Sequence, residues 1–273
     1  MRIVFIIIVE ESDQDTKNNQ KPILAKSGDE VGLLNEEKIS TIGHRSDPMN
    51  LLKEEIDLKT YPKRNQYAWF STFPDPSYGF DVDIDVEAVV SLAKKRGDSF
   101  FPYFFFLVMK GVHSVNELHL REEKGHVFRY QNIAPTWTVM SEAGIYNNVA
   151  CEMTWDFNEF YHRVRAITEK AKHCQPNGQL NQDPIVEQSN VVYATCIPQL
   201  EIVAMRHPTP SGDHDNLSIP RICWDKFRKK EDGHYHLILN ITVSHALVDG
   251  FPLAQCFNQI KADCLAPEKI LVR

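Results

Sequence analysis

The chain has 273 residues, a formal charge of −7 at pH 7 and a sequence pI near 5.9. This length allows one large domain or two small ones, with a substantial hydrophobic core. Because the net charge is negative and the sequence contains no long run of charges of one sign, we expect no nucleic-acid partner.

The apolar run at residues 3–9 (IVFIIIV) is too short for a membrane span, which needs about 20 apolar residues. Acidic residues follow it, and no small-residue cleavage site of a signal peptide is present. The six cysteines include no C-x-x-C pair, and none has a histidine at metal-ligand spacing. We therefore expect a cytoplasmic protein with reduced thiols, no metal and no membrane association.

Residues 10–55 are rich in Glu, Asp, Lys, Asn and Ser and contain few aromatic side chains. Such a segment buries too little apolar area to offset the entropy lost on ordering. We therefore expect residues 1–55 to be a poorly ordered or loosely attached leader. From residue 56 aromatic residues are frequent and no Pro-, Gly- or Ser-rich linker occurs, which indicates a single domain over 56–273.

Patterns typical of strands and helices alternate within this domain. The expected elements are, in chain order, a strand at 79–86, a helix at 86–95, a helix at 100–116, a hairpin at 120–130 that turns at 124–125, a strand at 136–141, a helix at 156–173, β-rich segments at 191–206, 219–227 and 236–245, and a helix at 252–264. The helix at 100–116 is apolar nearly all round, which indicates burial. A mixed β-sheet covered by helices accounts for this order.

The strand predicted at 236–245 ends in a histidine, within the sequence TVSHALVDGF at 242–251. Loops converge at strand ends and sites form there, and the ordinary pKa of histidine, near 6.5, suits a general base. Asp249 and Gly250 then form a turn into the last helix. The alternative is a buried, hydrogen-bonded histidine with a structural role. The pattern H-x-x-x-D-G alone does not decide between them, because a chance match is possible among 11 histidines.

This segment, followed by an aromatic residue and a helix, resembles the C-terminal signature of the chloramphenicol acetyltransferase family. The resemblance covers residues 58–265. Its segments are YPKRNQY at 61–67, Tyr78 with the strand after it, FFPY at 100–103, NELHLR at 116–121, PTWTV at 135–139, TCIP at 195–198 and HALVDG at 245–250. It implies the two-layer α/β sandwich of the CoA-dependent acyltransferases, with a large mixed sheet covered by helices.

The resemblance also implies a reaction, in which an acetyl group moves from the co-substrate acetyl-CoA to an alcohol within one ternary complex. His245 matches the family's general base, which takes the proton of the attacking hydroxyl. Thr195 stands at the position of the family's serine, whose hydroxyl stabilises the oxyanion of the tetrahedral intermediate. The alternative for Thr195 is a strand residue without a chemical role.

Three further positions correspond to supporting residues of the family, and two of them differ from the family in residue type. Asp249 matches an aspartate that pairs with an arginine and holds the histidine loop in shape. Lys63 stands at that arginine's position, so either Lys63 forms a weaker pair or Arg64 reaches the aspartate through a shifted register. Cys223 stands where the family usually has a threonine that orders a water near the oxyanion, and a thiol is a weak donor.

In the family, aromatic and small apolar side chains line the acceptor pocket, and members form homotrimers with the site at the subunit interface. The candidates by position are Tyr78, Phe80, Phe105, Trp137, Val139 and Cys223. Each of the aromatic candidates is equally compatible with a place in the core.

The resemblance thus implies a homotrimeric chloramphenicol O-acetyltransferase that inactivates the antibiotic and confers resistance, and the scattered cysteines indicate a cytoplasmic location. Two alternatives stay open. One is an acyltransferase of the same fold that acts on another alcohol or uses a longer acyl-CoA. The other is a trimeric binding protein that has lost turnover through the changes at Lys63, Thr195 and Cys223.

Overall fold

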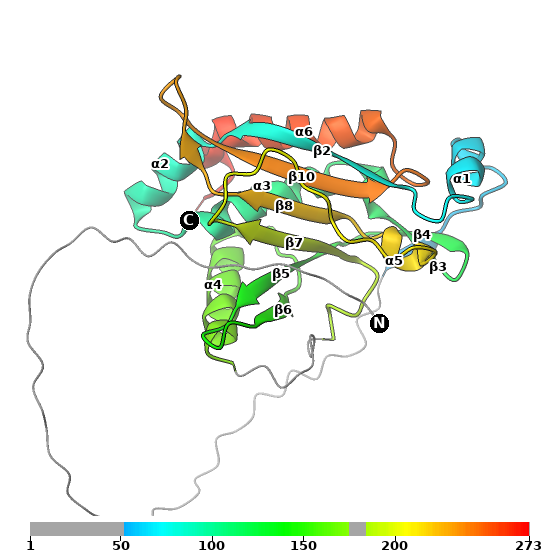
Figure 1. Cartoon of the computed structure of the whole chain (residues 1–273), viewed down its shortest axis with the longest axis horizontal. Helices are drawn as coiled ribbons and strands as arrows, with labels where there is room; N and C mark the ends of the chain where they lie inside the picture. Colours follow the sequence, from blue (N-terminus) through cyan, green and yellow to red (C-terminus); the bar gives the residue numbers. More distant parts are fainter. Residues whose placement is uncertain (1–51, 175–183, 273) are drawn as a thin grey trace, which may run out of the picture. The chain divides into compact units, whose positions relative to one another are not determined.

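A large mixed β-sheet organises the structure, a computed structural model that describes residues 52–174 and 184–272 (Figure 1). Its strands are β2 (Ser77–Asp85), β5 (Ala134–Met140), β6 (Tyr146–Ala150), β7 (Val191–Ile197), β8 (Arg221–Asp225), β9 (Arg228–Lys229) and β10 (Tyr235–Ser244). They lie in the order β2-β10-β8-β7-β5-β6, and β9 pairs with β10. Because β7 runs parallel to β5 and β8 while the other pairs are antiparallel, the predicted mixed sheet is confirmed.

The strand β10 shows how the sheet acquires one apolar face. Successive side chains of a strand point to opposite faces, and Leu237, Leu239, Ile241 and Val243 are all buried on the same face. Helices cover this face, with α6 along β2 and α4 along β5 and β6 (Figure 1). These helices are α2 (Glu87–Arg96), α3 (Phe100–His113), α4 (Phe157–His173) and α6 (Gly250–Leu265).

The helix α3 is buried as its sequence predicts, and it packs against α6. Ten of its 14 residues are buried, including three consecutive phenylalanines at 104–106. A Cβ atom added at Gly111 would lie 2.4 Å from the Ile260 side chain, so the absence of a side chain permits this close helix contact. The last helix, α6, forms as predicted after the turn at Asp249.

A second, smaller sheet has the strand order β1-β4-β3. Its strands are β1 (Lys53–Glu55), β3 (Leu120–Glu123) and β4 (His126–Tyr130), and the neighbouring short helices are α1 (Arg64–Phe70), η1 (Asn116–His119) and α5 (His214–Leu217). The predicted hairpin between β3 and β4 is confirmed. Its turn residues Lys124 and Gly125 have φ angles of 52° and 82°, as the favoured two-residue hairpin turn requires.

The strand β1 corrects the predicted boundary of the domain. Residues 53–55 were assigned to the leader, but they pair with β4. Their three side chains are charged and exposed, so they gave no apolar alternation. Backbone pairing and two ion pairs, Lys53–Glu123 and Arg129–Glu54, both 2.6 Å long, hold the strand instead. The rest of the predicted leader, residues 1–51, lies outside the described residues.

The other predicted elements agree with the structure, with two differences. The helix α3 ends at His113 rather than at residue 116. Residues 198–206, expected to be β-rich, contain neither helix nor strand. The strand β6 was not predicted because its sequence, YNNVA, is short and largely polar, as suits the edge of a sheet.

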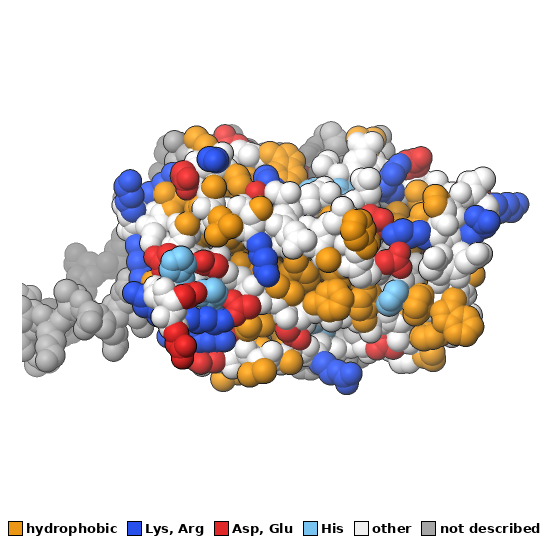
Figure 2. Space-filling model, turned by 90° about the horizontal axis from the view of Figure 1, so that it is seen from above, with side chains coloured by type: hydrophobic (Ala, Val, Ile, Leu, Met, Phe, Trp, Pro, Cys, Tyr) orange, Lys and Arg blue, Asp and Glu red, His pale blue; other side chains and the backbone are white. Residues whose placement is uncertain are grey.

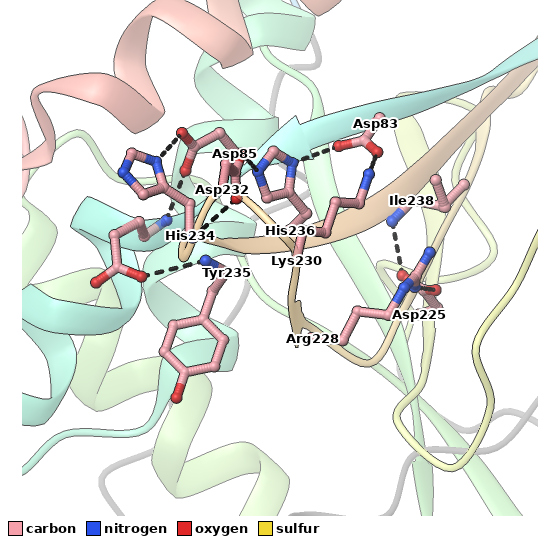
Figure 3. Close-up of polar contacts among 11 residues, drawn as sticks. Asp83, Asp85, Asp225, Arg228, Lys230, Asp232, His234, Tyr235, His236 and Ile238 are labelled. Carbon is pink, nitrogen blue, oxygen red and sulfur yellow. Dashed lines mark hydrogen bonds and ion pairs between the residues drawn. The ribbon is translucent and has the colours of Figure 1, made fainter.

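At the end of β10 remote from His245, histidine–aspartate contacts join the β9–β10 hairpin to β2 (Figure 3). His234 Nδ1 lies 2.7 Å from Asp85 Oδ2, and His236 Nδ1 lies 2.6 Å from Asp83 Oδ1. Lys230 also pairs with Asp83. The hydrogen bond to Asp85 raises the pKa of His234, so the protonated imidazole is the form favoured in this contact.

Two other histidines, His113 and His119, are largely buried, with ring centroids 5.0 Å apart. His113 donates from Nδ1 to the carbonyl of Met109 (2.9 Å) and accepts at Nε2 from the backbone N–H of Ile133 (3.1 Å). A second proton on the ring would face that N–H. Burial lowers the pKa of His113 to about 4 and lowers that of His119.

We expect the free energy of unfolding to fall by about 2 kcal/mol more between pH 7 and pH 5 in the wild type than in His113→Gln. The unfolded histidine binds a proton near its ordinary pKa of 6.5, whereas the folded one does so only near 4. This contribution is therefore present above pH 6.5 and is lost as the pH falls toward 4. Urea unfolding at both pH values measures it, with the exposed His126→Gln as control. An identical pH dependence in His113→Gln would contradict the expectation.

Candidate active site

His245 follows the last residue of β10, in a loop that backbone hydrogen bonds fix. Its N–H donates to the carbonyl of Pro76, just before β2 (2.9 Å). The N–H groups of Leu247 and Val248 both donate to the carbonyl of Ser244, at 3.1 and 3.0 Å, which closes a tight turn. The strand end thus presents the imidazole at the edge of the sheet.

Two aromatic rings hold the imidazole between them. The Phe70 ring is stacked on it, with centroids 3.9 Å apart and an interplanar angle of 18°. The Tyr78 ring lies at 4.4 Å and 32°, and its hydroxyl donates to the carbonyl of Val248 (3.0 Å). The Nδ1 atom of His245 is buried without a hydrogen-bond partner in the described chain, while the side chain as a whole is 31% exposed. The open edge of the ring is therefore the one that carries Nε2.

A lysine connects the histidine loop to two other segments. Lys63 Nζ lies 2.9 Å from Asp249 Oδ2 and 2.9 Å from Glu117 Oε1. Burial disfavours the charged ammonium, but the hydrogen bonds and charges of the two carboxylates outweigh it, so the pKa of Lys63 is raised. The other oxygen of Asp249, Oδ1, lies 3.8 Å from His245 Nδ1. Of the two predicted alternatives, the structure thus has Lys63 in contact with Asp249, and Arg64 lies on the exposed side of α1.

Thr195 lies in the middle of the large sheet, on the face away from the helices. It stands opposite Cys223 of β8, which stands opposite Asn240 of β10, so polar side chains form a row across the strands. Thr195 Oγ1 lies 3.0 Å from Thr138 Oγ1. Burial raises the pKa of the Cys223 thiol, so the sulfur stays protonated and is a weak donor.

Thr195 and His245 are far apart within one chain. They are separated by two strand spacings across the sheet and by the five residues from Asn240 to His245 along it. With about 4.8 Å between strands and about 3.4 Å per residue, the two Cα atoms lie about 20 Å apart. A single chain therefore does not bring these two groups to the same substrate.

The structure corrects part of the predicted acceptor pocket. Phe105, Trp137, Val139 and Cys223 are at most 1% exposed. The first three belong to the main hydrophobic core, where Phe105 and Trp137 are in edge contact at 5.9 Å. Aromatic character does not distinguish a core residue from a pocket residue. These four side chains therefore do not line an open pocket in this chain.

The remaining predicted pocket residue near His245 is Tyr78, with Phe80 beside it at 5.7 Å. Tyr78 also lines a cavity of about 510 Å³ on the polar face of β2 and β10. In that cavity His207 Nε2 donates to Asn240 Oδ1 (3.1 Å), and burial lowers the pKa of His207 to about 4. A cavity in which His207 is uncharged and hydrogen-bonded thus lies beside Tyr78, one of the two rings that hold the candidate base.

Exposed aromatic side chains surround the histidine loop. Trp69 and Phe73 contact each other at 5.9 Å, and Phe73 contacts Phe70 at 5.5 Å. On the other side, Phe80 and Phe251 are exposed near the start of α6. Figure 2 shows hydrophobic side chains gathered over the middle of the face seen there. Exposed apolar groups of this extent are typical of an interaction surface.

Sequence reasoning missed two residues of the site, Phe70 and Glu117. Glu117 lies within a segment of the resemblance and Phe70 lies three residues after another, but their roles depend on contacts with distant parts of the chain. Within residues 52–174 and 184–272, no three His, Cys, Asp or Glu side chains are grouped so as to hold a metal ion. No helix in these ranges is long and apolar enough to cross a membrane.

The fold is that of the CoA-dependent acyltransferases. A solved chloramphenicol acetyltransferase superposes with a TM-score of 0.70, at 19% identity, over 77% of this chain and 99% of that one. A probable dihydrolipoamide acetyltransferase from Listeria monocytogenes gives a TM-score of 0.56 at 15% identity, over 81% and 96% of the two chains. At these identities the solved structures establish the fold alone.

The sequence places the chain more narrowly, because the family model described as "Chloramphenicol acetyltransferase" matches residues 49–261. The chain belongs to the chloramphenicol acetyltransferase family, so the predicted family, fold class and assignment as an acyltransferase are confirmed. It is 22% identical over 218 residues to chloramphenicol acetyltransferase 2 of Escherichia coli, covering 77% of this chain and 95% of the relative. A chloramphenicol acetyltransferase of Klebsiella sp. is 22% identical over 214 residues, covering 77% and 92%.

Lys63→Met is expected to lower the free energy of unfolding by about 1 kcal/mol, because the ion pairs are partly exposed and two carboxylates lose their counter-ion. Arg64→Met, in the next position on the exposed side of α1, is the matched control and is expected to change it by less than about 0.5 kcal/mol. Urea unfolding of the three proteins at pH 7 measures both effects. A larger loss in Arg64→Met than in Lys63→Met would show that the pairing is assigned to the wrong residue.

Proposed function

We propose that the protein transfers the acetyl group of acetyl-CoA to an alcohol, and that chloramphenicol is the acceptor. The observation that carries this proposal is the open Nε2 edge of His245, on an imidazole held between two rings. The acceptor is suggested by the relatives, which are named chloramphenicol acetyltransferases. Acetylation of this antibiotic would confer resistance on the cell that produces the protein.

His245 acts as the general base in this proposal. Its Nε2 takes the proton from the acceptor hydroxyl as the oxygen attacks the thioester carbon, and then returns the proton to the departing CoA sulfur. The rings of Phe70 and Tyr78 fix the plane of the imidazole. Asp249, held by Lys63, fixes the loop. A positioned base of this kind contributes about 10²- to 10⁴-fold to the rate.

Thr195 supplies the hydroxyl that stabilises the oxyanion on the attacked carbon. The Thr138 hydroxyl, 3.0 Å away, restricts its rotation, so the donor is oriented before the reaction begins. The extra methyl group of threonine relative to serine leaves the donor itself unchanged. The protonated Cys223 thiol beside it gives little further hydrogen bonding.

The complete site is formed between subunits of a homotrimer. Since Thr195 and His245 lie about 20 Å apart in one chain, the base of one subunit works with the oxyanion donor of its neighbour. The exposed aromatic side chains around His245 provide an apolar surface for that neighbour. A cytoplasmic location is supported by the six cysteines, no two of which are joined by a disulfide in the described residues.

His245→Ala is expected to reduce thiol release from acetyl-CoA in the presence of chloramphenicol by about 10²- to 10⁴-fold. His126→Ala, at an exposed position in the small sheet, is the control and should retain full activity. The assay is repeated with a panel of other alcohols and with longer acyl-CoA thioesters. Turnover with another alcohol but not with chloramphenicol would show that chloramphenicol is not the acceptor. Binding without thiol release from any substrate would refute the proposed reaction.

Mixing two inactive variants tests the site between subunits. Thr195→Val is expected to reduce the rate by about 10²- to 10³-fold, the effect of removing an oxyanion donor in other enzymes. When His245→Ala and Thr195→Val chains are unfolded, mixed in equal amounts and refolded together, about a quarter of the interfaces combine an intact histidine with an intact threonine. Activity should return to about that fraction of the wild type. If the activity of the refolded mixture stays at the level of the separate variants, each site lies within one chain.

A further inference from the structure

A second polar pocket lies outside the groups assigned to acetyl transfer. It has a volume of about 470 Å³ and opens between the end of α1, the β3–β4 turn and α5. The polar side chains that line it are Tyr67, Ser71, Glu122, Asp213, His214 and Asp215. Three of these six are carboxylic acids and none is lysine or arginine, so the lining has an excess of acidic groups.

Glu122 is the buried member of this group. It is 4% exposed, and its Oε1 atom is buried without a hydrogen-bond partner among the residues that the structure describes. The nearest ring nitrogen, His214 Nδ1, lies 3.7 Å from Oε2, which is beyond hydrogen-bonding distance. A buried carboxyl oxygen without a hydrogen-bond donor costs free energy. The described chain supplies no donor for Oε1.

The surroundings determine how Glu122 holds its proton. Burial, together with the neighbouring charge of Asp215, raises its pKa to about 7, and the Tyr67 hydroxyl opposes this shift. Burial and Glu122 in turn raise the pKa of Tyr67 to about 12, so the phenol stays protonated. Near neutral pH the carboxyl is therefore present in both forms, and a nearby cation would favour the ionised one.

Asp213 and Asp215 are held in fixed positions at the rim. Asp213 Oδ1 accepts from the backbone N–H of Asn216 at 3.1 Å. Both oxygens of Asp215 accept from the backbone N–H of Lys124, at 2.9 and 3.1 Å. These bonds fix the negative charges without neutralising them. The pocket thus offers a buried acceptor at its base and two fixed carboxylates at its entrance.

We propose that this pocket binds a small organic cation through a primary ammonium or guanidinium group, with Glu122 as the inner acceptor. An N–H-bearing cation supplies both the charge and the donor that the carboxyl lacks. A metal ion fits less well, since no three ligating groups are gathered here or elsewhere in the described residues. The volume leaves room for an organic body beyond the charged head.

Calorimetric titration of the full-length protein with n-butylammonium chloride at pH 7.5 tests the proposal. Tetramethylammonium chloride, a cation without N–H groups, is titrated at the same ionic strength. We expect saturable binding of butylammonium, much weaker binding of tetramethylammonium, and about a 10- to 100-fold loss of affinity in Glu122→Gln. Glu123→Gln is the matched control, because Glu123 is adjacent on β3 but bonds Lys53 and lies outside the pocket. It should bind as the wild type does.

Thermal unfolding first verifies that Glu122→Gln is folded. If that variant does not fold, Tyr67→Phe, which keeps the carboxyl and removes only the hydroxyl, should still weaken butylammonium binding. Absence of saturable binding to the wild type, equal binding of the two cations, or unchanged affinity in the folded variants would overturn the proposal. A lysine or arginine from another subunit is the other source of the same chemistry. Such a side chain would block binding of butylammonium, and Glu122→Gln would then reduce the fraction of assembled protein in sedimentation. That result would overturn the proposal that the pocket binds a free organic cation.

Discussion

The ammonium group of Lys63 joins three segments that are far apart in the sequence. It contacts Glu117 in η1 and Asp249 in the turn before α6, both at 2.9 Å, while Lys63 itself immediately precedes α1. Since α1 also carries the Phe70 ring that is stacked on His245, the same ion pairs fix both the loop and the ring beside it. The orientation of the candidate base therefore depends on a charge contributed from the start of the domain.

The strand β10 links this loop to the rest of the fold. Its apolar side chains are buried under the helices, and Asn240, on its other face, belongs to the polar row that contains Cys223 and Thr195. The end of the strand presents His245 at the edge of the sheet. Stability and chemistry are thus divided between the two faces and the end of one strand, so a one-residue shift in its pairing would disrupt all three.

The local sequence pattern was sufficient to predict much of the fold. The buried helix α3, the hairpin at Lys124 and Gly125 and the strand β10 were all predicted, because periodicity and turn residues specify them locally. The strands β1 and β6 were missed because polar edge strands carry no apolar alternation. In the site, a motif singled out His245 and Asp249. The contact of Phe70 with His245 could not be predicted, because it depends on how distant segments pack. Nor does the type of an aromatic residue say whether it faces a core or a pocket, as Trp137 shows.

The distance between Thr195 and His245 also determines how activity would depend on the amount of protein. Under the proposed function an isolated chain holds no complete reaction centre, so turnover begins only where copies associate. At low expression, doubling the number of chains then more than doubles the number of working centres. A defective copy likewise disables centres that it shares with intact neighbours, so one damaged gene would impair the product of another.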